Sequence, residues 1–107
     1  VEDGLECYTG QYLSAKRFFP AWHLEEEHEL VKGALEALRQ IGANPAVSTY
    51  PFCTNGSYSA GVAGLPTIGF GPGDEAGMHT ADEKIQLEQL FAAAAGYQAI
   101  ACKFLLK

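Results

Sequence analysis

A glycine-rich turn over residues 69–77 constrains this chain more than any other feature. An apolar run from Pro66 to Phe70 leads into the turn, His79 follows it, and a helical pattern begins soon afterwards. Glycine tolerates backbone angles that other residues avoid, so this segment suits a sharp reversal at the end of a strand. The arrangement predicts that the turn holds the imidazole of His79 in place, as a metal site requires.

The composition predicts one small folded domain. The chain has 107 residues, of which 48% are hydrophobic, so it can bury a core. Its net charge of −6 argues against nucleic acid as a partner, and no lysine or arginine cluster favours an anionic membrane. No apolar stretch reaches the roughly 18 residues needed to span a bilayer, and no signal-peptide pattern opens the sequence.

The cysteines indicate a reducing compartment. Cys7, Cys53 and Cys102 are odd in number and lack CxxC spacing, which favours free thiols in a cytoplasmic protein. Free cysteine is usually buried, so each is expected to be a small core side chain. Cys53 lies in a polar turn and is the most reactive candidate.

The periodicity predicts α/β alternation. Residues 1–20 are expected to be extended, followed by a helix over 25–41, a strand over 46–50, a short helix over 57–63, a strand over 67–70 and a helix over 87–105. Gly42 is expected to cap the first long helix in the left-handed conformation. Three short strands cannot cover the apolar faces of two long helices. We therefore expect that the chain is part of a larger protein or that it self-associates.

Both long helices carry apolar stripes. The helix over 25–41 has two adjacent stripes. The first comprises Leu24, Val31, Leu35 and Leu38, and the second comprises Leu30, Ala34, Ala37 and Ile41. The stripe of the helix over 87–105 comprises Leu87, Leu90, Phe91, Ala94, Tyr97, Ala101, Phe104 and Leu105. These stripes predict the core-facing sides.

His79 is the main candidate for chemistry, with a loop-capping histidine as the alternative. Glu83 follows it closely and could hold its second ring nitrogen or brace the loop. His23 and Glu27 are spaced for chelation, but a surface or packing role is favoured for His23. Asp74 and Glu75 are expected to be solvated loop acids.

Two further turns offer groups for a ligand. Thr54-Asn55-Gly56-Ser57 provides hydroxyl, amide and backbone donors that suit a carboxylate or oxyanion, with an ordinary turn as the alternative. Gly71-Pro72-Gly73 lacks the lysine of a phosphate loop.

Three motifs in order resemble the C-terminal part of M20-family metallopeptidases, which include acetylornithine deacetylase and succinyl-diaminopimelate desuccinylase. They are Phe52-Cys53-Thr54-Asn55-Gly56, Gly64-Leu65-Pro66-Thr67-Ile68-Gly69-Phe70-Gly71-Pro72-Gly73 and His79-Thr80-Ala81-Asp82-Glu83-Lys84-Ile85. The resemblance covers about residues 18–105. Phe19-Pro20-Ala21-Trp22 looks most like the YgeY-like branch.

The resemblance implies a catalytic α/β sandwich with an inserted lid domain. It also implies two Zn²⁺ or Co²⁺ ions and a glutamate base that together hydrolyse amide bonds of N-acyl amino acids or small peptides. Mapped onto this chain, His79 is the last metal ligand and Glu83 supports it. Thr54, Asn55 and Gly56 face the substrate, and Gly71 and Gly73 line the same cleft.

The departures from the family pattern are large. The family's N-terminal H-x-D motif, its Glu-Glu pair, its further acidic ligand and its lid histidine do not occur here. By resemblance, residues 1–17 are the tail of the lid (dimerisation) domain and residues 18–107 are the C-terminal part of the catalytic domain. We therefore expect no catalytic residue here, weak metal binding at most, and an N-terminal part of the enzyme as partner.

Two rival functions remain open at this point. One is a stand-alone α/β interaction domain without catalysis, in which the glycine turn is only a turn. The other is a small thiol protein, which the missing CxxC spacing disfavours.

Overall fold

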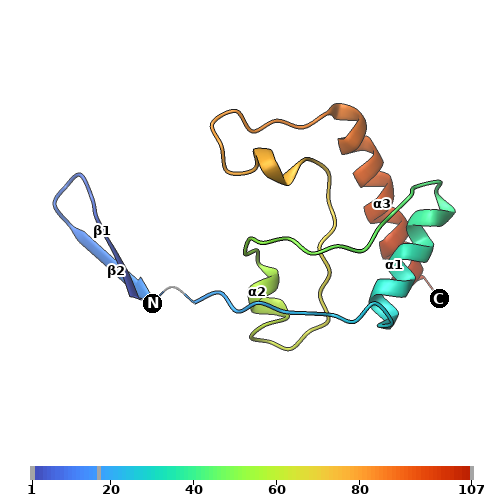
Figure 1. Ribbon diagram of the computed structural model, residues 1–107, viewed down its shortest axis with the longest axis horizontal. Coiled ribbons are helices and arrows are strands. Elements are labelled where there is room, and N and C mark those ends of the chain that lie inside the picture. Colours follow the sequence, from blue (N-terminus) through green and yellow to red (C-terminus); the bar gives the residue numbers. More distant parts are fainter. Residues whose placement is uncertain (1, 17, 107) are drawn as a thin grey trace.

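The computed structural model describes residues 2–16 and 18–106. The elements follow in the order β1 (Glu2–Glu6), β2 (Tyr12–Lys16), α1 (Glu29–Gln40), α2 (Gly56–Ser59), the 3₁₀ turn η1 (Glu75–Gly77) and α3 (Leu87–Leu105) (Figure 1). A small sheet and two long helices agree with the predicted α/β class.

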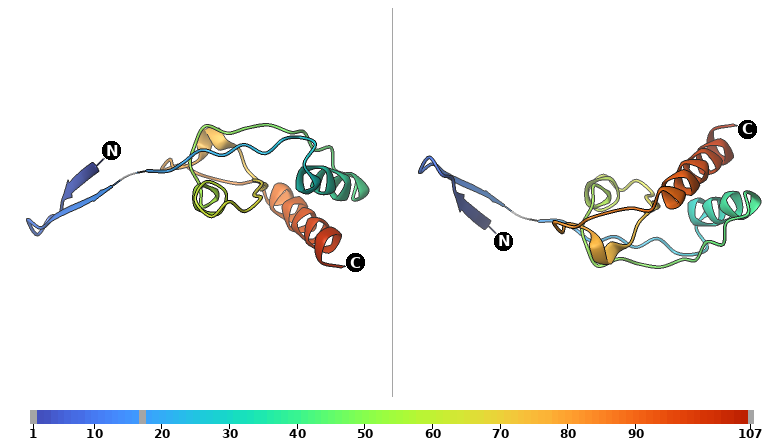
Figure 2. Two further views of the ribbon diagram at one scale, coloured as in Figure 1. Left: turned by 90° about the horizontal axis from the view of Figure 1, so that it is seen from below. Right: turned by 90° about the horizontal axis from the view of Figure 1, so that it is seen from above.

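The two strands form an antiparallel hairpin. Glu2 pairs with Lys16 and Glu6 with Tyr12. The Cys7 N–H donates to Gln11 O at 2.7 Å, and Gly10 occupies the left-handed region with φ 83°. Both views of Figure 2 show the hairpin extending away from the helices. Its assignment to a lid over residues 1–17 stays a prediction, and Val1 and Arg17 lie outside the described residues.

Helix α1 begins four residues later than the sequence pattern predicts. His28 is its N-cap, with extended backbone angles, and His28 Nδ1 accepts a hydrogen bond from the Leu30 N–H at 3.0 Å. This side-chain acceptor satisfies a helix donor that otherwise lacks a partner, so the helix starts at Glu29 rather than at residue 25. Gly42 ends it with φ 83°, which confirms the predicted cap.

The core lies between α1 and α3. Its buried apolar side chains are Val31, Ala34, Ala37, Leu38 and Ala93. Two glycines allow α1 and α3 to pack closely. A Cβ at Gly33 would lie 2.5 Å from the Phe104 ring, and a Cβ at Gly96 would collide with the side chains of Leu38 and Phe70. Most of these buried side chains are small, so the core itself is small.

The bounds predicted for α3 are confirmed, but most of its predicted core stripe is wrong. Leu87, Phe91 and Leu105 are 66%, 69% and 78% exposed. The buried positions are instead Ala93 and Gly96, because small residues let the α3 backbone lie close to α1. One side of α3 therefore packs on α1, while an apolar side remains exposed. Among the described residues, no helix has the length and apolar character to cross a bilayer.

The strands predicted over 46–50 and 67–70 are not strands in the described chain. Both segments are extended, but neither joins a sheet; the sheet found among the described residues contains β1 and β2 alone. A strand needs a neighbour to pair its backbone groups. Here Thr67 O and Phe70 O instead accept hydrogen bonds from the side chains of Trp22 and Tyr97.

The short helix predicted over 57–63 is reduced to α2. After Ser59 the chain turns, and Gly64 adopts φ 70°. The Leu65 N–H donates to Ser59 O at 2.8 Å, which folds the following segment back onto α2.

The predicted burial of the cysteines is wrong. Cys7 is half-buried, whereas Cys53 and Cys102 are exposed. Their positions explain this result: Cys7 follows β1 in the loop of the protruding hairpin, Cys53 lies in a surface loop, and Cys102 lies on α3.

The chain is less compact than a self-contained domain of its length. Its radius of gyration is 17.5 Å, and it extends 54 × 33 × 23 Å. A compact domain of similar length has a radius of about 13 Å. The protruding hairpin and the exposed apolar side of α3 leave a large surface uncovered.

We predict that the chain self-associates in solution. Exposed apolar patches larger than a few hundred Å² tend to find partners, and unpaired strand edges tend to pair. Light scattering across a concentration series should show a mass that rises above 11.5 kDa. A monomer at high concentration with cooperative thermal unfolding would contradict this prediction and favour the stand-alone domain.

We also predict that His28→Ala destabilises α1 by roughly 0.5–2 kcal/mol, the usual cost of losing an N-cap acceptor. His28→Asn is the matched control, because asparagine retains a side-chain acceptor. Denaturant unfolding followed by circular dichroism measures the difference. Equal loss in both variants would show that the imidazole acts through packing instead.

Candidate metal and substrate site

His79 lies on an exposed turn between η1 and α3. It is the one non-glycine residue among the described residues with positive φ, at 59°. This left-handed conformation costs about 1 kcal/mol for a residue with a side chain, although histidine tolerates it better than most. Such an angle persists where surrounding contacts enforce it, and it makes His79 a candidate functional residue.

Glu83 enforces the conformation of this turn. The His79 N–H donates to Glu83 Oε2 at 3.2 Å, and the Glu83 N–H donates to Thr80 O at 3.2 Å. Thr80 Oγ1 donates to Gly77 O at 2.7 Å. Of the two roles considered for Glu83, this structure has the carboxylate bracing the loop at the backbone of His79.

The described residues do not fit a complete metal site. In residues 2–16 and 18–106, no group of three or more His, Cys, Asp or Glu side chains is placed to hold a metal ion. Zinc takes four ligands in a structural site and three plus water in a catalytic one. His79 could therefore supply one ligand of a site whose other ligands come from elsewhere.

The other histidines have structural or surface positions. His23 Nε2 lies 3.4 Å from Glu25 Oε1, and both side chains are more than two-thirds exposed. Glu27 instead lies near Lys32, at 3.7 Å. The spacing of His23 and Glu27 thus produces no chelating pair, and the surface role favoured for His23 agrees with the structure. His28 is occupied as the cap of α1.

Thr54, Asn55 and Gly56 form the turn that starts α2. Thr54 Oγ1 accepts a hydrogen bond from the Gly56 N–H at 3.1 Å. The Asn55 side chain is exposed and makes no capping hydrogen bond. Gly56 is buried, because the Trp22 indole covers it so closely that a Cβ would overlap the ring. The turn therefore presents Asn55 outward, while Gly56 provides a packing surface.

The glycine turn is fastened to α3. The Gly73 N–H donates to Gln89 Oε1 at 2.9 Å, and Gly73 has φ 101°. The Tyr97 hydroxyl donates to Phe70 O, and the two rings pack edge to face with centroids 5.0 Å apart. These contacts place the exposed residues Gly71 and Gly73 at a defined position beside α3.

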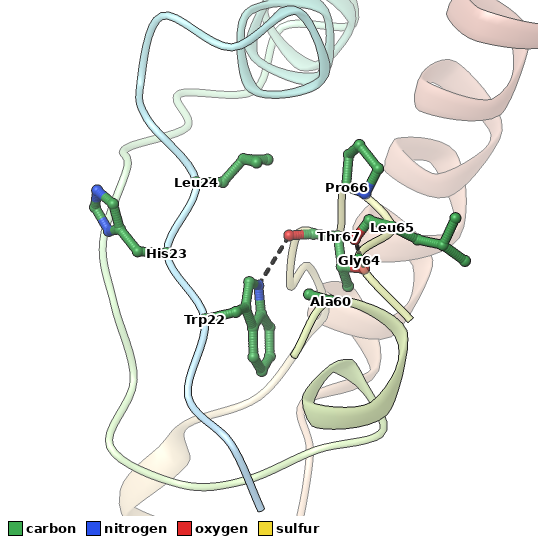
Figure 3. A pocket seen from close by; sticks show the side chains of 8 residues that line it. All are labelled: Trp22, His23, Leu24, Ala60, Gly64, Leu65, Pro66 and Thr67. Atoms are coloured by element: carbon green, nitrogen blue, oxygen red, sulfur yellow. Dashed lines mark hydrogen bonds between the residues drawn. The ribbon is translucent and has the colours of Figure 1, made fainter. Parts of the chain in front are cut away.

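A hollow of about 180 Å³ is lined by Trp22, His23, Leu24, Ala60, Gly64, Leu65, Pro66 and Thr67. Figure 3 shows its lining, in which the Trp22 Nε1–H donates to Thr67 O at 3.0 Å and the His23 ring points away. None of the site residues predicted from the sequence lines this hollow. In Figure 1, α2 and the short helix before residue 80 lie apart, with extended chain between them.

Comparison with known proteins identifies the family. The sequence model of peptidase family M20/M25/M40 matches residues 11–103. This chain belongs to that family. The matched range contains every site residue predicted above, and it confirms the resemblance seen in the three motifs.

Two curated relatives extend this result. The chain is 38% identical over 99 residues to the uncharacterized protein YgeY of Escherichia coli K12, and equally to that of E. coli O157:H7. Each match covers 92% of this chain but 25% of the relative. The chain thus spans about a quarter of the length of the curated relatives it matches. The search of solved structures found no significant match.

Membership places the chain in a family of hydrolases that are generally metal-dependent. The roles of His79, Glu83 and the two turns stay predictions. Residues that sequence reasoning missed are those that hold the turns: Tyr50, Gln89 and Tyr97. Trp22 stood in the stretch from Phe19 that resembles the YgeY-like branch, but its contact with Gly56 joins residues far apart in sequence, which periodicity does not reveal.

We predict weak zinc binding by this chain, micromolar or weaker in Kd, because the described residues supply an incomplete ligand set. Calorimetric titration with Zn²⁺ measures it, and His79→Ala should weaken it further. His23→Ala is the matched control, since that histidine is also exposed but lies outside the turn. Tight binding that survives His79→Ala would place the metal elsewhere, for example at a cysteine.

Proposed function

We propose that this chain is the C-terminal part of a binuclear zinc-dependent hydrolase that cleaves amide bonds of N-acyl amino acids or small peptides. The observation that carries the proposal is the family match over residues 11–103, which includes the His79 turn. The reaction class comes from the family, while the contributions of individual residues are argued from their contacts below.

His79 would be a metal ligand in the intact protein, and a bound metal pair would supply Lewis-acid activation there. Its side chain is exposed, and its backbone is fixed by the Glu83 carboxylate at 3.2 Å. A ligand on a braced turn loses less conformational freedom on binding a metal than one on a loose loop. Glu83 would therefore act by aiming the imidazole through the backbone.

The turn before α2 would contact the polar part of the substrate. Asn55 is exposed and its amide makes no helix-capping bond, so it can donate to and accept from a ligand. Thr54 Oγ1 already accepts from the Gly56 N–H, which leaves its own hydrogen as a donor. By the family resemblance, Gly71 and Gly73 would line the same cleft, where the absence of side chains admits a ligand.

The rest of the active site would come from the part of the protein that the relatives have in addition. A general base and further ligands are missing from the sequence motifs of this chain, and the exposed apolar side of α3 is a surface for that part to cover. We also propose a cytoplasmic location, on the ground of an odd number of cysteines without CxxC spacing.

A stand-alone interaction domain is the second candidate, and the exposed apolar side of α3 favours it. The two readings differ in what lies upstream of Val1. An H-x-D motif in the same reading frame supports the hydrolase, and its absence supports the interaction domain.

We predict that this chain alone has no amidase activity, because it lacks the motifs for the general base and the other ligands. The assay uses Zn²⁺ or Co²⁺ with a panel of N-acyl amino acids. The longer reading frame is the matched positive control, and there His79→Ala should abolish turnover. If turnover is proportional to the amount of the 107-residue chain and a chelator abolishes it, the chain is active by itself and the prediction is wrong.

A further inference from the structure

Trp22 links segments that are far apart in the sequence. It lies in the extended stretch before α1, and its Nε1–H donates to Thr67 O at 3.0 Å (Figure 3). The far edge of the same indole covers Gly56 at the start of α2, where a Cβ would overlap it. One side chain therefore contacts the turn at residues 54–56 and the segment that leads into the glycine turn.

Tyr50 extends this contact to the glycine turn itself. Its ring meets the Trp22 indole edge to face, with centroids 6.1 Å apart and an angle of 76° between the planes. The other side of Tyr50 stacks on Phe52, with centroids 4.5 Å apart. A Cβ at Gly69 would lie 2.7 Å from Tyr50 Cε1, so this ring covers Gly69 as the indole covers Gly56.

The exposed residues of the two turns are held in place by hydrogen bonds and by neighbouring rings. Thr54, Asn55, Gly71 and Gly73 are all exposed. Their positions are set by neighbours: α3 holds the glycine turn through Tyr97 and Gln89, whereas the turn before α2 has the indole against its buried glycine.

We propose that Trp22 is a positioning residue that fixes the turn at residues 54–56 relative to the glycine turn at residues 69–73. Its importance for substrate rests on the proposed function, but the positioning itself does not. The indole makes two kinds of contact that can be separated. Its N–H donates a hydrogen bond to Thr67 O, and its ring packs against Gly56 and Tyr50. Trp22→Phe removes the first and retains part of the second, whereas Trp22→Ala removes both.

Amide hydrogen exchange of the 107-residue chain tests the proposal. Trp22→Ala should speed exchange about tenfold or more at the hydrogen-bonded amides of residues 56–60 and of Leu65, with α1 and α3 unchanged. Trp22→Phe should give a smaller increase at the same amides. Tyr8→Ala is the matched control, because it removes an aromatic ring that is fully exposed on the hairpin. Equal acceleration in α1 and α3, or none at residues 56–60 and Leu65, would overturn the proposal.

The contact with Gly56 is tested by a double-mutant cycle. Gly56→Ala should displace the indole and shift its fluorescence to longer wavelength, a clean signal because Trp22 is the single tryptophan. In a background carrying Trp22→Phe, Gly56→Ala should speed exchange at residues 54–60 less, because the smaller ring leaves room for the new methyl group. Additive effects would show that the two residues do not act on each other.

These readouts use neither turnover nor metal. An inactive longer protein with the expected exchange pattern would refute the hydrolase and leave the role of Trp22 intact. Turnover by the longer protein, together with additive effects of the Trp22 and Gly56 substitutions on exchange, would support the hydrolase and refute the role of Trp22.

Discussion

The close packing of α1 on α3 is the contact on which the rest of this structure depends. It is made by alanines and glycines, with Gly33 admitting the Phe104 ring and Gly96 admitting Leu38 and Phe70. Phe70 belongs to the segment that leads into the glycine turn, so the same contact that forms the core also anchors the candidate site. Lys103 Nζ and Glu36 Oε2, 3.0 Å apart, add a partly exposed ion pair worth little by comparison.

This packing also explains the large exposed apolar surface. A helix that is apolar on more than one side needs more than one neighbour. α3 uses its small residues against α1, and Leu87, Phe91 and Leu105 remain exposed. The edges of the hairpin and the extended segments 46–50 and 67–70 likewise present backbone groups that no neighbouring strand pairs among the described residues.

The candidate site is held together by hydrogen bonds from side chains to the backbone, and not by the hydrogen bonds of a helix or a sheet. Trp22, Tyr97 and Gln89 bond to backbone groups of residues 67, 70 and 73, and the Glu83 carboxylate bonds to the backbone of His79. Gly73 has a left-handed backbone angle that residues with a side chain rarely adopt, and the rings of Trp22 and Tyr50 leave no room for a side chain at Gly56 and Gly69. The turns are thus exposed, and neighbouring side chains hold their backbone in place.

The sequence by itself determined the features that depend on neighbouring residues. The bounds of α3, the left-handed cap at Gly42 and the three motifs of the M20 family are all local patterns, and each was confirmed. The class of the fold also followed from them. The start of α1 was missed because His28 caps the helix by a rotamer choice that helical periodicity does not contain.

Only the tertiary structure decided which faces are buried and what holds the turns. The α3 stripe is apolar in sequence, but contact with α1 selects Ala93 and Gly96, because backbone approach depends on the shape of the partner. Segments 46–50 and 67–70 have strand-like sequences, yet a strand exists only where another strand pairs with it. The cover of Trp22 over Gly56 likewise joins residues far apart in sequence, and such contacts are set by the packing of the whole chain.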